Sequence, residues 1–284
     1  MDLVWYLLIL GLVAIVAGFV GSLTGIGGGI VIIPVLIIFF NVPLIVAIGA
    51  SVITILANSA TTGSAYIRDH LTDLRIGMFL EIATVPGAII GATLTVVLVQ
   101  GGLAQALVIA LGVLLVIIAI SGFLRHHPPF VTEFHPDARS RRLGFRGDYH
   151  DAHLGHPIHY EAENTNSALG IMFGAGLVSG MFGIGSGVLK VFALDDALKL
   201  PIKVSTATSN FMIGVTACAG AGILLMAGYV NALIAAPMAI GATAGAFAGS
   251  LLLPGLASRT VRIAFLLVVL GLAIELIVRG VGGP

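Results

Sequence analysis

The sequence predicts an all-α integral membrane protein made of two inverted repeats of about five helices each, with broken or re-entrant glycine-led helices at the centre. Three observations carry this prediction: an apolar composition, a series of membrane-length apolar runs, and an internal repeat. Of the 284 residues, 58% are hydrophobic and 9% are charged, whereas soluble domains carry about 25% charged residues. A soluble domain of this size could not hide so much apolar surface from water, so the expected solvent is lipid.

The composition also excludes several classes of function. The formal net charge is zero, so no basic face for nucleic acid is expected. Cys218 is the single cysteine, which excludes an intrachain disulfide framework. No Walker, Rossmann or protease motif occurs, and we therefore expect neither an enzyme nor a cofactor.

Eight apolar runs approach the length of about 20 residues that a helix needs to cross a bilayer core of about 30 Å. They lie at roughly 3–22, 44–66, 75–98, 103–124, 166–182, 204–226, 230–253 and 260–279. Two shorter segments, 26–41 and 184–199, follow glycine clusters and are either short spans or re-entrant helices. The polar stretch 125–165 separates membrane repeat 1 (1–124) from membrane repeat 2 (166–284).

The two membrane segments match each other at a fixed offset of 158 positions, without a gap. The aligned pairs include Gly25 with Gly183, Gly27 with Gly185, Gly29 with Gly187, Pro43 with Pro201, Ser51 with Ser209, Gly87 with Gly245 and Gly91 with Gly249. An apolar composition by itself produces matches of Ile, Val and Ala, so the Gly, Pro and Ser matches carry the weight. The sequence therefore predicts two copies of one structural unit.

Basic residues concentrate in some of the connecting loops, and short cytoplasmic loops are enriched in Lys and Arg. The basic connections carry Arg68, Arg75, Lys199, Lys203, Arg259 and Arg262, and the central loop is also basic. The turns near 41–43, 99–102 and 227–229 carry neither Lys nor Arg. All basic loops lie inside if each half crosses the membrane five times, counting the short glycine-led segments. An odd number of crossings inverts the second repeat and places both termini outside.

Each glycine cluster predicts a break between two helices. Glycine costs about 1 kcal/mol per residue inside a helix, and the free N–H groups at a helix start carry roughly half a positive charge and bind anions. Secondary transporters hold their substrate near the midplane, where helices break. We therefore expect an anion site at the breaks, and the alternative is close helix packing through small residues. The predicted substrate-binding residues there are Gly25, Gly27, Gly28, Gly29, Gly183, Gly185, Ser186 and Gly187.

Lys190 follows the second cluster within an apolar segment, and its repeat equivalent is Ile32. A lysine at membrane depth costs about 2.5–3.5 kcal/mol, so it normally faces a partner, a cavity or a substrate. We expect Lys190 to supply positive charge to an anionic substrate. The alternatives are a lysine that reaches the membrane surface and a lysine paired with Asp195 or Asp196.

Polar residues at the start of later apolar runs complete the predicted site. Ser51 and Ser209 are repeat equivalents, and Asn210 is present in the second repeat only; we expect these three to bind substrate, with Asn58 a weaker candidate. Hydroxyls in membrane helices also bond to their own backbone, which is the alternative.

Glu81 and Asp195 are the candidate coupling residues. A buried carboxylate at Glu81 would suit proton coupling, although Arg75 lies about 9 Å of helix away, and an ion pair between the two at the membrane surface is the favoured interpretation. Glu275 and Arg279 are four residues apart and predict a local pair.

Seven histidines lie between His126 and His159 and raise the question of a zinc site. Gly155 and Pro157 interrupt any helix that would gather them on one face, and no cysteine accompanies them. We therefore expect a solvated His- and Arg-rich cytoplasmic loop without a metal, and a pH- or metal-sensing role stays open.

These motifs resemble the TauE/SafE sulfite exporter family. The resemblance covers both halves and rests on Gly25-Ile26-Gly27-Gly28-Gly29 with Pro34, Arg68-Asp69, Leu74-Arg75, Pro86-Gly87-Ala88, Gly91-Ala92, Gly183 to Val191, Pro201-Ile202-Lys203-Val204 and Ala207 to Met212. It implies an exporter of sulfite, sulfoacetate or a related sulfur-containing or organic anion, driven by an ion gradient. Phe192 departs from the family pattern, in which a proline is common, and Asp195-Asp196 add acidic charge near Lys190.

We therefore expect a multi-pass secondary transporter of the plasma or inner membrane, which exports a small anion by alternating access. Its expected partners are the anionic substrate, the lipid bilayer and a proton or sodium ion as coupling ion; a homo-oligomer stays open. The alternatives are an anion channel and a non-transporting membrane sensor or accessory protein.

Overall fold

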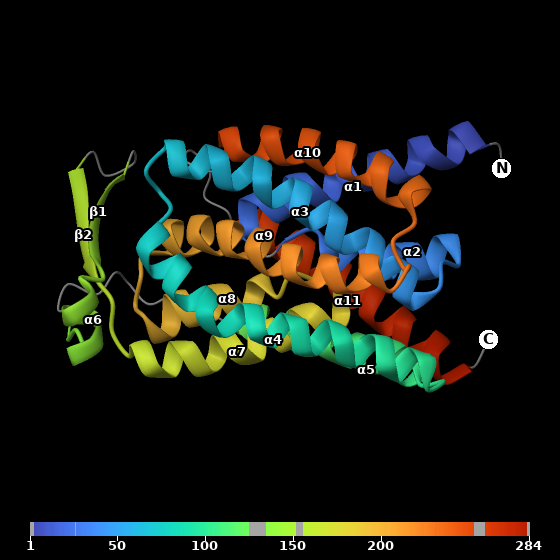
Figure 1. Ribbon diagram of the computed structural model, residues 1–284. Coiled ribbons are helices and arrows are strands. Elements are labelled where there is room, and N and C mark those ends of the chain that lie inside the picture. The colour runs from blue at the N-terminus through green and yellow to red at the C-terminus, as the bar shows by residue number, and fades with distance from the viewer. Residues whose placement is uncertain (1–2, 26, 125–134, 152–155, 253–258, 283–284) are drawn as a thin grey trace.

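A computed structural model describes residues 3–25, 27–124, 135–151, 156–252 and 259–282 (Figure 1). Within these ranges, eight helices are long and apolar enough to cross a membrane. They are α1 (Leu3–Thr24), α3 (Leu44–Arg68), α4 (Leu74–Gln100), α5 (Ala104–Leu124), α7 (Thr165–Phe182), α9 (Ile202–Met226), α10 (Ala232–Leu252) and α11 (Arg259–Gly282). The predicted all-α membrane fold is therefore confirmed, and each predicted span ends within a few residues of an observed helix.

The two ambiguous segments form short helical elements that follow the glycine clusters. They are α2 (Gly29–Phe40), α8 (Gly187–Phe192) and the π-helical turn η1 (Ala193–Ala197). The 12 residues of α2 extend over about 18 Å, which is less than the apolar core of about 30 Å. Neither short element is long enough to cross the core by itself.

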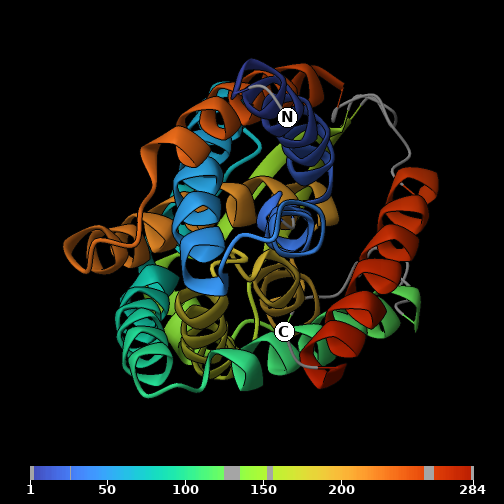
Figure 2. The same cartoon turned by 90° about the vertical axis from the view of Figure 1, so that its right-hand side faces the viewer.

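The helices pack in pairs that exchange partners between the two halves. Helix α1 packs on α10, α4 packs on α7, and α3 packs on α9. Figure 2, viewed from the end where both termini lie, shows the α1–α10 pair and the α4–α7 pair on opposite sides of the molecule. Helices α5 and α11 form a further pair.

Glycines allow the exchanged pairs to approach closely, and the same contacts occur in both. A Cβ atom added at Gly87 would collide with the backbone oxygen of Phe173, and one added at Gly245 would collide with that of Ile15. These two contacts are related by the 158-position offset of the sequence repeat. The repeated glycines therefore set the distance between the backbones of α4 and α7 and of α1 and α10.

Both termini lie at one end of the helix bundle, and the central segment forms a small structure at the other end (Figure 1). This structure contains α6 (Ala138–Leu143) and an antiparallel hairpin of β1 (Arg146–Asp151) and β2 (His156–Glu161). The expectation of a solvated loop was wrong for this part of the segment. The alternation of apolar residues at Phe145, Tyr149, Ile158 and Tyr160 was the sequence signal for it.

The hairpin packs against the helix ends and connects to both halves. The Tyr160 hydroxyl donates to Asp73 Oδ2 over 3.0 Å, and the rings of Phe145 and Phe79 meet edge to face. The backbone N–H of Glu163 donates to the carbonyl of Leu198, which follows η1. Burial, and then the Asp73 carboxylate, raises the pKa of the Tyr160 phenol above its ordinary value, so the hydroxyl keeps its proton at neutral pH.

Candidate functional site

Both glycine clusters break the helix that precedes them. Helix α1 ends at Thr24 and α2 begins at Gly29, whereas α7 ends at Phe182 and α8 begins at Gly187. The glycines with positive φ are Gly25 (67°), Gly27 (80°), Gly183 (60°) and Gly185 (75°). Other residues rarely adopt this conformation, so these glycines are what permits the chain to leave the helix at both points.

Two buried serines hold the breaks from opposite halves. The Ser51 hydroxyl on α3 donates to the carbonyl of Gly183 over 2.8 Å, and the Ser209 hydroxyl on α9 donates to that of Gly25 over 2.9 Å. These contacts are again related by the 158-position offset, and each connects one half to the other. Both serines were predicted to bind substrate, and in this conformation each hydroxyl donates its hydrogen bond to the protein backbone.

The space beside the breaks is filled by two isoleucines that are also repeat equivalents. A Cβ atom added at Gly185 would lie 3.1 Å from Ile213 Cγ2 and 3.6 Å from Ile55. Ile213 also faces Gly27, whose added Cβ atom would lie 3.7 Å from the carbonyl oxygen of Ile184. The two breaks therefore come close to each other, with apolar side chains packed against both.

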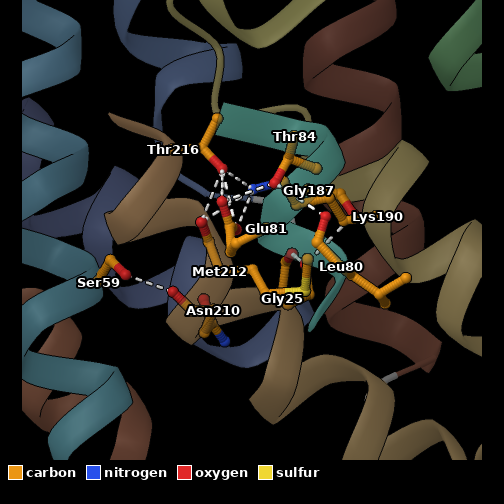
Figure 3. Close-up of polar contacts among 11 residues, drawn as sticks. Gly25, Ser59, Leu80, Glu81, Thr84, Gly187, Lys190, Asn210, Met212 and Thr216 are labelled. Carbon is orange, nitrogen blue, oxygen red and sulfur yellow. Dashed lines mark hydrogen bonds and ion pairs between the residues drawn. The ribbon is translucent and has the colours of Figure 1, made fainter. Parts of the chain in front are cut away.

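The charged part of the site lies beside the second break. Lys190 on α8 is completely buried, and its Nζ lies 3.4 Å from Glu81 Oε1 on α4 (Figure 3). The same nitrogen donates to the carbonyl of Met212 over 2.9 Å and makes a short contact with the Thr216 hydroxyl, both on α9. Three elements thus meet at one ammonium group. The ion pair corrects the favoured interpretation of Glu81, which was a pair with Arg75. For Lys190, pairing with Asp195 or Asp196 was only an alternative, and the carboxylate that it contacts is Glu81 instead.

Two threonine hydroxyls complete the surroundings of the Glu81 carboxylate. Thr84 Oγ1 donates to Oε2 over 2.6 Å, and Thr216 Oγ1 lies 3.1 Å from both carboxylate oxygens (Figure 3). Neither threonine was predicted from the sequence. Thr84 lies one helical turn after Glu81, which was an available signal, whereas Thr216 comes from a distant helix.

Arg75 forms its hydrogen bond outside this cluster. Arg75 Nη1 donates to the carbonyl of Gly144, next to α6, over 2.9 Å. Asp195 is half-buried in η1. The pair predicted between Glu275 and Arg279 is confirmed, with 3.1 Å between Oε1 and Nε.

Several buried polar atoms near the breaks have no hydrogen-bond partner among the residues that the structure describes. They are both amide atoms of Asn58, Oδ1 of Asn210 and the hydroxyl of Ser186. The Asn210 amide nitrogen donates to the Ser22 carbonyl over 3.0 Å, and its backbone oxygen accepts from Ser59 (Figure 3). Unpaired buried polar atoms cost stability, and they are the groups to which a polar ligand could bind.

The histidines considered for a zinc site lie partly outside the described residues. His126, His127 and His153 lie in segments that the structure does not describe. In the described part of the chain, no group of three or more His, Cys, Asp or Glu side chains is arranged to hold a metal ion. His159 pairs instead with Asp148 over 2.7 Å, across the hairpin.

A multi-pass helical bundle with two helix breaks and a buried ion pair beside one of them is an arrangement typical of membrane transport proteins, and the comparisons with known proteins agree with this class. The model of the family described as "Sulfite exporter TauE/SafE" matches residues 10–276. The chain is also 31% identical over 234 residues to the "Probable membrane transporter protein YunE" of Bacillus subtilis (strain 168), covering 80% of this chain and 81% of that protein.

The chain therefore belongs to the TauE/SafE sulfite exporter family and is a multi-pass membrane transporter. No solved structure matches it.

Proposed function

We propose that this transporter exports a small sulfur-containing or organic anion, such as sulfite or sulfoacetate, by alternating access, and that the anion binds between the two helix breaks. Lys190 carries this proposal. It is a completely buried cation directly beside the second break, and a charge at membrane depth is costly unless it serves a partner or a substrate. The family's printed description supports the substrate class.

The breaks add dipoles of the right sign. Helix α2 begins at Gly29 without a side-chain cap, so its first N–H groups have no side-chain partner, and such groups favour an anion. The hydroxyl of Ser186, which has no hydrogen-bond partner among the described residues, offers a further donor to an anion in the same region.

The packing of the two halves supports an inverted repeat and a rocking motion. Contacts at the breaks and between the exchanged helix pairs occur twice, 158 positions apart. Helix α1 starts at the end of the bundle where both termini lie, whereas its equivalent, α7, starts at the hairpin end (Figure 1). Two equivalent units around one site are the arrangement that many transporters use for alternating access.

The test is flux in proteoliposomes with labelled sulfite, thiosulfate, sulfoacetate, taurine and simple carboxylates. The proposal expects accumulation of at least one anion above its electrochemical equilibrium when a proton or sodium gradient is imposed. Flux that only equilibrates the anion would indicate a channel. The absence of flux and of binding for all of these anions would overturn the proposal.

A further inference from the structure

The ammonium group of Lys190 has no donor left for a substrate in this conformation. A lysine ammonium has three N–H donors, and three acceptors surround it: a Glu81 oxygen, the Met212 carbonyl and the Thr216 hydroxyl. An anion can therefore bind to Lys190 only if one of these acceptors leaves.

Glu81 is the acceptor that can separate. Met212 and Thr216 lie on the same helix, where the Thr216 hydroxyl also bonds to the Met212 carbonyl over 2.9 Å, so these two acceptors move together. Glu81 comes from α4, on the other half of the chain, and at 3.4 Å its contact is the longest of the three. A displacement of the halves would stretch this contact first.

A carboxylate that leaves Lys190 would be an unpaired charge at membrane depth. Among the described residues, the charged side chain in contact with Glu81 is Lys190. Its other side-chain partners are neutral hydroxyls, Thr216 on α9 and Thr84 on α4 itself. An isolated buried carboxylate is so unfavourable that it takes up a proton instead. The Thr84 hydroxyl donates to Glu81, and the single O–H of Thr216 is within reach of both Glu81 and the Met212 carbonyl. Either hydroxyl can rotate and accept the O–H of a protonated Glu81.

We infer that Glu81 is an internal substitute for the substrate: the anion replaces the Glu81 carboxylate at Lys190, and Glu81 binds a proton as it leaves. This rests on the proposed function and deepens it, since it identifies the coupling ion as the proton. The exchange accounts for every ion, because the site gains one anion and one proton and Lys190 keeps its charge. A monoanion leaves the net charge of the site unchanged, whereas a dianion such as sulfoacetate makes it more negative by one. Anion and proton then cross together, and an outward anion gradient carries the proton out.

The first experiment measures the apparent Kd of purified protein for sulfoacetate and for thiosulfate as a function of pH. Neither probe gains or loses a proton near neutral pH, so any proton taken up belongs to the protein. Because the bound state holds one more proton than the free state, affinity should rise about tenfold for each unit that the pH falls while Glu81 is ionised in the free protein.

Variants test whether Glu81 is the source of this dependence. Glu81→Gln should bind the anion with an affinity that no longer depends on pH, because glutamine cannot exchange a proton. Glu275→Gln removes a carboxylate from an exposed ion pair on α11 and should keep the full slope. If Glu81→Gln fails to fold, Glu81→Gln with Lys190→Met removes both charges together, and its binding should be lost at every pH.

The outcomes separate the two proposals. Binding of either probe without a pH slope, or a slope that persists in Glu81→Gln, would overturn the exchange and leave the proposed transport intact. If neither probe binds to the wild-type protein at any pH, the exchange at Lys190 is overturned. If no anion is transported in the flux assay either, the proposed function is overturned as well.

Discussion

The two helix breaks share one geometry and differ in their chemistry. Each break uses positive-φ glycines and receives a serine hydroxyl from the opposite half. The second break also carries the cluster of Lys190, Glu81 and Thr216. The positions equivalent to these three residues are Ile32, Ala239 and Asn58.

This difference separates the residues that shape the site from those that select its ligand. The features present in both repeats, glycines and serines, set the course of the backbone. The charged features are present once, so the proposed site contains a single cation, and on the equivalent side both Asn58 amide atoms have no hydrogen-bond partner among the described residues. One charged and one neutral side suit a small anion, whereas two lysines would repel each other.

The largest effect is expected from removing the charge that only one break has. Lys190→Met should reduce anion uptake by about 100-fold, since losing a buried charged contact costs about 3 kcal/mol. Uptake of labelled sulfoacetate into proteoliposomes measures this. The control is Lys199→Met, which changes a lysine in the connection between η1 and α9. This variant should transport normally. Wild-type uptake by Lys190→Met would remove this residue from the site.

A side chain at a break glycine should have the next largest effect. Gly183→Ala places a Cβ in a left-handed backbone conformation and 2.7 Å from Ile48 Cγ2, so we expect a loss of about 1–3 kcal/mol together with reduced transport. Thermal unfolding in detergent and flux assays measure the two effects. Gly174→Ala, where no atom lies within 4 Å of the added Cβ, is the control and should be neutral or stabilising.

The two serines test whether the shared geometry is equally important on both sides. Ser51→Ala and Ser209→Ala should each destabilise the protein by about 1–3 kcal/mol, because each leaves a buried carbonyl unpaired. Similar shifts in unfolding temperature are expected. If one variant is as stable as the wild type while the other unfolds, the equivalence of the breaks is wrong.

The smallest effect is expected at the hairpin, far from both breaks. Tyr160→Phe removes the hydrogen bond to Asp73 and should lower stability by about 1 kcal/mol, with anion binding unchanged. Thermal unfolding and sulfoacetate binding measure this. A loss of binding would show that the hairpin contributes to the site, and the breaks would then not be the only part of the described molecule on which binding depends.

The sequence by itself determined the solvent, the spans, the repeat and the positions of the breaks. These features depend on local properties: apolar length, the helix-breaking cost of glycine, and matches at a constant offset. The breaks at Gly25 and Gly183 could be predicted because few other residues adopt a positive φ.

Tertiary structure alone decided which side chains meet. Glu81 and Lys190 are 109 positions apart in the chain, and Arg75 was the nearer candidate by sequence. Helix α4 packs on α7 and α9 of the other half, and this packing places Glu81 beside Lys190 on α8. The partners of Ser51 and Ser209 and the packing of the hairpin could not be predicted either, because these contacts also join segments that are far apart in the sequence. A buried polar group takes whichever partner the packing of distant helices provides, and no local pattern encodes that choice.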